Sequence, residues 1–140
     1  MQTYDLSRYT QSHQTDFCRA LSEIQRGRKE THWMWYIFPQ IQGLGHSPTA
    51  VYYAIQSAGE ARAFLEDPYL SGNLCQICSA LLELNTNDPL AVFGHPDNMK
   101  LKSSMTLFAC VADDPDLFKR VLDKFFDGEK DERTLQILGF

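Results

Sequence analysis

Apolar residues recur at helical spacing along most of the chain. Phe17, Ala20, Leu21 and Ile24 lie at i, i+3, i+4 and i+7, which marks one face of a helix, and the same spacing recurs in residues 117–125. No segment alternates apolar and polar residues with a period of two or carries a tight-hairpin dipeptide. The pattern predicts an all-α protein, a single compact multi-helical domain with short helices and loops over residues 1–140.

Polar caps, prolines and glycines indicate where the helices begin and end. Asp5 predicts a short first helix over residues 6–12, and Ser12 or Thr15 can begin a second helix that Gly27 ends. Prolines at the first helical position favour helix starts as well. Further starts are expected at Ser47-Pro48, at the capping box Ser57 to Glu60, at Gly72 for a helix reaching Leu84, and at Asp88-Pro89, Pro96-Asp97 and Asp114-Pro115, with a last turn docked by Leu135 and Leu138.

The stretch from Thr31 to Gly59 contains no Asp, Glu, Lys or Arg, although charged residues make up 22% of the chain. It holds both tryptophans, so we expect much of it to be buried. Residues 33–38 are too short and too uniformly apolar for spacing to distinguish a helix from a strand, and Pro39 ends them in either case. Residues 40–46 carry two glycines and are expected to form a loop.

The net charge and the cysteine content limit the kinds of function that the protein is expected to have. The formal net charge of −5 argues against a nucleic-acid surface, although the basic stretch 19–29 is compatible with a local anion site. No apolar run approaches the length of a membrane span, and the polar N-terminus does not resemble a signal peptide. The four cysteines occur in apolar helical contexts, so we expect a cytoplasmic protein with reduced thiols. The pair Cys75 and Cys78 lacks the further ligands of a structural zinc site, and no metal is expected.

Three motifs together resemble the family of small bacterial proteins known as domain of unknown function 1810. They are residues 29–40 (KETHWMWYIFPQ), residues 43–47 (GLGHS) and residues 100–109 (KLKSSMTLFA). The resemblance extends over nearly the whole chain. It implies an all-helical fold and a helix at residues 33–38, and it brings no established activity or cofactor.

His32 is the first candidate for chemistry. It lies beside Arg28 and Lys29, where the chain changes from charged to apolar, and there it can act as a general base or an anion ligand. If residues 33–38 are helical, His32 shares a face with Trp35, Tyr36 and Pro39. The structural alternative is a buried histidine bonded to a backbone carbonyl.

Two further groups suit an anion. The loop Gly43 to Ser47, with Gly45 at its centre, leads into a helix start whose backbone N–H groups can hold a phosphate, or it is an ordinary turn. On the helix after Asp97, the residues Leu101, Met105 and Phe108 are expected in the core. Lys100, Ser103 and Ser104 fall together on another face, which is either an anion contact or a solvated face.

These candidates lead to two hypotheses. The first is a protein that binds, and in a catalytic version processes, a small anionic ligand that is nucleotide-like or carries a phosphate, in an aromatic-lined pocket. Its residues are Arg28, Lys29, His32, Trp35, Gln40, Gly43, Gly45, Ser47, Lys100, Ser103 and Ser104. The second is a protein-interaction module whose aromatic groove receives a partner. The sequence decides neither between them nor whether the protein is an enzyme.

Overall fold

A computed structural model of the chain describes residues 4–140. Within them the chain forms nine helices, which confirms the all-α prediction. None of these helices is long and apolar enough to cross a membrane. The helices are α1 (Ser7–Gln25), α2 (Met34–Ile37), α3 (Pro48–Tyr53), α4 (Ala58–Glu66), α5 (Pro68–Glu83), α6 (Pro89–Phe93), α7 (Asp97–Val111), α8 (Asp116–Phe126) and α9 (Glu132–Leu138).

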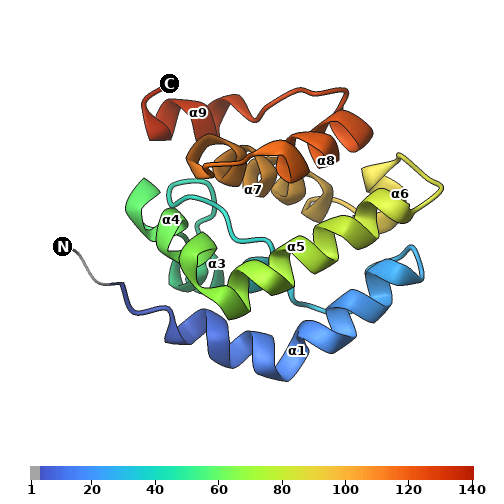
Figure 1. Ribbon diagram of the computed structural model, residues 1–140, viewed down its shortest axis with the longest axis horizontal. Helices are drawn as coiled ribbons and strands as arrows, with labels where there is room; N and C mark the ends of the chain where they lie inside the picture. Colours follow the sequence, from blue (N-terminus) through green and yellow to red (C-terminus); the bar gives the residue numbers. More distant parts are fainter. Residues whose placement is uncertain (1–3) are drawn as a thin grey trace.

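The long helices are stacked, with α1 on one side, α5 in the middle and α7 to α9 on the other side (Figure 1). Helix α5 packs against both α1 and α8, and α7 packs against α4, α6, α8 and α9. Because α7 is enclosed on so many sides, nine of its fifteen residues are buried. Helix α8 covers it with one apolar face that buries Phe118, Val121, Leu122 and Phe125.

Helix α1 is continuous from Ser7 to Gln25, so the predicted break near Ser12 and Thr15 is wrong. Both hydroxyls are satisfied without interrupting the helix. Ser12 Oγ is 2.8 Å from the hydroxyl of Tyr53, and Thr15 Oγ1 donates to the carbonyl of Gln11, one turn earlier. A hydroxyl with such a partner has no need to cap a new helix.

Helix α5 begins at Pro68, four residues earlier than predicted. The Asp67 carboxylate accepts hydrogen bonds from the backbone N–H groups of Tyr69 and Leu70, so Asp67 is the cap. Only one of the two hydrogen bonds of the predicted capping box at Ser57 forms. The Ser57 hydroxyl accepts from the Glu60 N–H, but the Glu60 carboxylate accepts from the N–H of Gln56 instead of Ser57.

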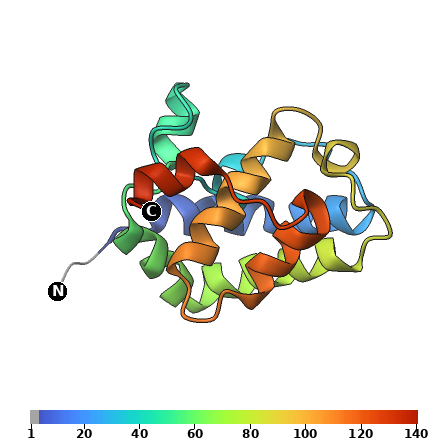
Figure 2. The same cartoon turned by 90° about the horizontal axis from the view of Figure 1, so that it is seen from above.

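The predicted helix starts at Ser47-Pro48, Asp88-Pro89, Pro96-Asp97 and Asp114-Pro115 are confirmed within about one residue. Chain segments after α2 and after α3 meet at an isolated parallel β-bridge between Ile41 and Ile55. There the Gln42 N–H donates to the Ile55 carbonyl at 2.9 Å, and the Ile55 N–H donates to the Gln40 carbonyl at 2.8 Å. Residues 42–54, which we call the α3 excursion, therefore leave and rejoin the stack at one place, and α3 stands out from the body (Figure 2).

Candidate functional site

The aromatic segment at residues 33–38 lies largely in the hydrophobic core. Trp33 and Phe38 are fully buried, and the Trp33 ring packs against the rings of Phe38 and Phe93. Residues 34–37 form the single turn α2, so the helix implied by the family resemblance is present but short. Because it begins only at Met34, His32 lies outside it. His32 is exposed, whereas Tyr36 and Pro39 are buried, so the predicted common face is wrong.

A buried glutamate on α1 fixes the segment before α2. The Glu23 Oε1 atom accepts from the N–H groups of Glu30 (2.7 Å) and Thr31 (2.9 Å) and from Trp33 Nε1 (2.9 Å), and Oε2 accepts from the Thr31 hydroxyl (2.5 Å). We call this arrangement the Glu23 clasp. Burial raises the pKa of the Glu23 carboxyl, but these hydrogen bonds outweigh it and lower the pKa to about 2.

The buried structural histidine is His13, not His32. Its Nε2 lies 2.8 Å from the Tyr36 carbonyl, which can only accept, so Nε2 carries the proton. Its Nδ1 lies 3.1 Å from the Asn73 amide nitrogen and accepts from it. Burial lowers the pKa of His13, so the ring is held neutral. The Tyr36 hydroxyl donates a hydrogen bond to the Asp16 carboxylate. This network ties α1, α2 and α5 together.

Two lysines predicted as anion ligands meet at one carboxylate. Lys29 Nζ is 2.9 Å from Asp97 Oδ2, and Lys100 Nζ is 3.4 Å from Asp97 Oδ1. Each ammonium also lies over an indole ring, Lys29 at 5.2 Å from the Trp33 centroid and Lys100 at 5.3 Å from the Trp35 centroid. We call these five residues the lysine–tryptophan cluster. It carries two positive charges and one negative charge, and Lys100 is its more exposed cation, at 24% against 8% for Lys29.

Trp35, Gln40 and Gly45 line one small hollow together with residues of the α3 excursion. Its volume is about 10 Å³, enough for one water molecule and too small for a nucleotide. Gly45 is required there by packing, because an added Cβ would lie 2.6 Å from the Cβ of Ala50. Within residues 4–140 the side-chain amide of Gln40 has no hydrogen-bond partner, so it can donate and accept toward a ligand.

The other predicted residues lie apart from this hollow. Arg28 and Lys29 line a separate depression of about 260 Å³ beside α6. Gly43 has a positive φ of 97° and lies against Ile137 of α9. The Ser47 hydroxyl is used as the cap of α3, where it accepts from the Ala50 N–H.

The interpretation of Ser103 and Ser104 as a solvated face is wrong, because both are buried beneath the neighbouring helices. Ser103 Oγ donates to the Met99 carbonyl at 3.2 Å. Ser104 is completely inaccessible, and its hydroxyl has no hydrogen-bond partner among the described residues. A ligand on the surface reaches neither hydroxyl, so of this predicted group only Lys100 is accessible.

Sequence reasoning missed Asp97, which brings Lys29 and Lys100 together. The spacing of Asp97 and Lys100 (i, i+3) was a usable signal for their pairing on one helix. The meeting of Asp97 with Lys29 has no local signal, because the two residues are 68 positions apart. Within residues 4–140, no three His, Cys, Asp or Glu side chains are grouped to hold a metal ion.

Comparisons with known proteins agree with this fold. The conserved hypothetical protein Rv1873 from Mycobacterium tuberculosis, known from its crystal structure, is 38% identical to this chain, with a TM-score of 0.95 and 98% of both chains covered. No curated protein matches. The family described as protein of unknown function DUF1810 matches residues 3–138, which is nearly the whole chain. The chain therefore belongs to the DUF1810 family.

Proposed function

We propose that the protein acts in the cytoplasm and binds a small ligand that joins an anionic group to a flat aromatic ring, such as a nucleotide. The observation that carries the proposal is the lysine–tryptophan cluster, where the partly exposed ammonium of Lys100 lies over Trp35. The phosphate of such a ligand would pair with Lys100, and its ring would lie against Trp35.

Local charge supports this choice. Asp97 is shared by Lys29 and Lys100, so one carboxylate faces two ammonium groups and leaves an excess positive charge. The protein as a whole is acidic, with a formal charge of −5, so a cationic cluster beside an indole is a local exception. An anion can replace part of the contact between Lys100 and Asp97 at a small cost in free energy. Lys29 lies closer to Asp97 and would still neutralise its charge.

The free amide of Gln40 gives the ligand a second polar contact. Gln40 and Trp35 line the same hollow, and an amide can donate to and accept from the edge of a base. Because the hollow holds only about one water molecule, the proposed ligand lies across its mouth. Arg28, His32, Gly43 and Ser47 have no part in this version of the site, and no catalytic step is proposed.

The two tryptophan indoles give a direct test by NMR. The Trp33 indole N–H is buried and donates to Glu23, so it serves as an internal control for the indole of Trp35. We expect AMP to shift the Trp35 indole resonance and to leave that of Trp33 unchanged. Adenosine and inorganic phosphate, each of which offers half of the recognition, should bind at least about tenfold more weakly. Trp35→Phe assigns the two signals.

A pair of variants on α7 identifies the cation. Lys100→Met should weaken AMP binding about tenfold or more, since it removes the charge that meets the phosphate. Lys102→Met is the matched control, because Lys102 lies on another face of α7 and pairs with Glu129 at 3.5 Å. An unmoved Trp35 signal at millimolar AMP, or equal losses in the two variants, would contradict the proposal.

Docking of a protein partner is the second candidate, and the exposed apolar residues of α3 favour it. Val51 and Tyr52 are 56% and 60% exposed on the protruding excursion. Exposed tyrosines commonly anchor interfaces, and the neighbouring valine adds apolar area to the same patch. If a partner docks there, the double variant Val51→Ser and Tyr52→Ser should lose a crosslinked complex that Lys100→Met retains. A complex that survives the double variant would exclude α3 as the docking element.

A further inference from the structure

A ligand-sized hollow with an apolar floor lies on the side of the molecule formed by α4, α5 and the α7–α8 turn, and it shares no residue with the lysine–tryptophan cluster or with the small hollow beside Gln40. Its volume is about 260 Å³. The buried side chains of Val111 and Phe118 and the partly buried side chain of Leu65 contribute to its floor. Its rim is polar and consists of Arg62 and Glu66 from α4, Ser71 and Cys75 from α5, and Asp113 and Asp114 from the α7–α8 turn.

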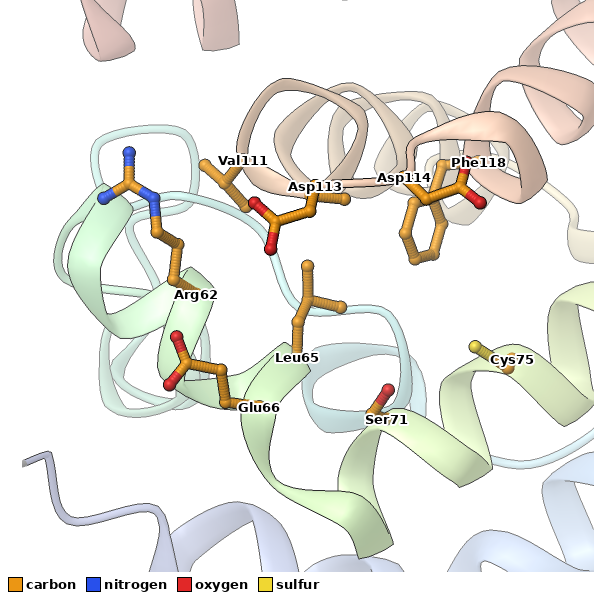
Figure 3. Close-up of a pocket in the computed structure, with 10 residues that line it drawn as sticks. Arg62, Leu65, Glu66, Ser71, Cys75, Val111, Asp113, Asp114 and Phe118 are labelled. Carbon is orange, nitrogen blue, oxygen red and sulfur yellow. The ribbon is translucent and has the colours of Figure 1, made fainter.

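The rim is acidic, with three carboxylates against one guanidinium. Asp113 projects over Leu65 into the hollow, with Arg62 and Glu66 on one side and Cys75 on the other (Figure 3). Within residues 4–140, neither Glu66, Asp113 nor Arg62 forms a salt bridge. Asp114 accepts from the Asp116 N–H at 3.1 Å, which fixes the turn that presents both aspartates. The carboxylates of Glu66 and Asp113 are thus free to pair with an incoming cation.

We propose that this hollow binds a small organic cation with an apolar tail, a primary alkylammonium. The chemistry follows from the division between floor and rim. A tail of several methylene groups would lie on Leu65, Val111 and Phe118, and each CH₂ group that leaves water there would strengthen binding. The ammonium would donate to the carboxylate of Asp113, and the negative charges of Asp114 and Glu66 on the rim would add to the attraction. This ligand has the opposite charge to the one proposed for the lysine–tryptophan cluster, so the two proposals stand or fall separately.

The chain carries its own reporter for this site. Cys75 is an exposed thiol on the rim, and Figure 3 shows its sulfur directed toward the hollow. Cys18 is an exposed thiol on α1 that does not line the hollow, so it serves as the matched control within the same molecule. Cys78 is fully buried, and Cys110 is partly buried. Alkylation by iodoacetamide, followed by peptide mass spectrometry, measures Cys75 and Cys18 in a single sample.

The first measurement is protection by hexylammonium. We expect saturating hexylammonium to slow alkylation of Cys75 at least about fivefold and to leave Cys18 within about 1.5-fold, because a bound tail blocks access to the thiol. Hexanoate, which has the same tail and the opposite charge, should protect neither thiol. An unprotected Cys75, or equal protection by hexanoate, would overturn the proposal. The test uses the wild-type protein alone.

The second measurement tests the contribution of the negative charge on the rim. At low ionic strength, Cys75 should react faster with a cationic methanethiosulfonate than with an anionic one, relative to Cys18. The variant Asp113→Asn with Asp114→Asn should reduce that preference about fivefold and abolish protection by hexylammonium. Asn at position 114 keeps an oxygen for the turn. The control Glu30→Gln with Glu132→Gln removes two exposed charges elsewhere, and an equal reduction there would also overturn the proposal.

Discussion

Replacing Glu23 by Gln tests the Glu23 clasp with almost no change in shape. The pKa of this carboxyl falls from an ordinary 4.5 to about 2, so the charged form stabilises the fold by about 3 kcal/mol at pH 7. Gln can still accept from the N–H groups of Glu30 and Thr31, but without the negative charge. We therefore expect Glu23→Gln to lower the free energy of unfolding by about 3 kcal/mol at pH 7, a large share of the 5–15 kcal/mol typical of a domain.

The dependence of the free energy of unfolding on pH tests the role of the Glu23 charge more directly than a measurement at pH 7 alone. Because the folded state has the lower pKa, the stabilisation is complete above about pH 4.5 and is lost as the pH falls toward 2. The difference between wild type and Glu23→Gln should therefore shrink to about 1 kcal/mol at pH 3. Urea unfolding followed by circular dichroism at both pH values measures it.

Glu30→Gln is the matched control for this prediction. Glu30 is 58% exposed and its carboxylate pairs with Arg26 at 3.8 Å, so its loss should change stability by less than about 0.5 kcal/mol. A difference between wild type and Glu23→Gln that stays constant from pH 7 to pH 3 would refute the charge argument. It would assign the loss to packing instead.

Three other perturbations have expected outcomes. Lys124→Met should cost about 2 kcal/mol in urea unfolding, because the Lys124 ammonium donates to three carbonyls at the C-terminus of α5, and the exposed Lys119→Met should cost almost nothing. Glu60→Ala should cost about 3 kcal/mol, since it leaves the partly buried guanidinium of Arg8 without its carboxylate partner at 2.7 Å, and a loss below about 1 kcal/mol would contradict this. His13→Asn should flatten the decline of stability below pH 6.5, because burial lowers the pKa of His13 and the unfolded state binds the proton first. A slope between pH 7 and 5 equal to that of wild type would exclude His13 as its source.

The sequence predicted correctly those helix starts that depend on hydrogen bonds between residues close together in the chain. Ser47, Asp88 and the prolines after them set helix starts through contacts within three residues, so they could be found from the sequence. Ser12 looks like an equally good cap, but its hydroxyl meets Tyr53, 41 residues away, and the helix continues through it. A cap is thus predictable only when no distant partner competes for its hydroxyl.

The candidate site was predicted in part for the same reason. Trp35, Gln40 and Lys100 were selected by their types and end close to one hollow, but the burial of Ser103 and Ser104 depends on which helices surround α7. The histidines show the limit most clearly. His32 has the more distinctive sequence context, yet His13 is the buried one, because α5 supplies Asn73 and closes over it.

The β-bridge between Ile41 and Ile55 has a consequence for how DUF1810 proteins can diverge. The chain enters and leaves the α3 excursion through one pair of hydrogen bonds, and residues 48–51 between them contribute no buried residue to the core. Doubling the length of such a closed loop costs only about 0.6 kcal/mol in entropy. Insertions and deletions should therefore accumulate within residues 48–51, where a relative can gain a new contact surface and keep the same core. These residues lie after the family motif at residues 43–47 and before Tyr53, whose hydroxyl meets Ser12.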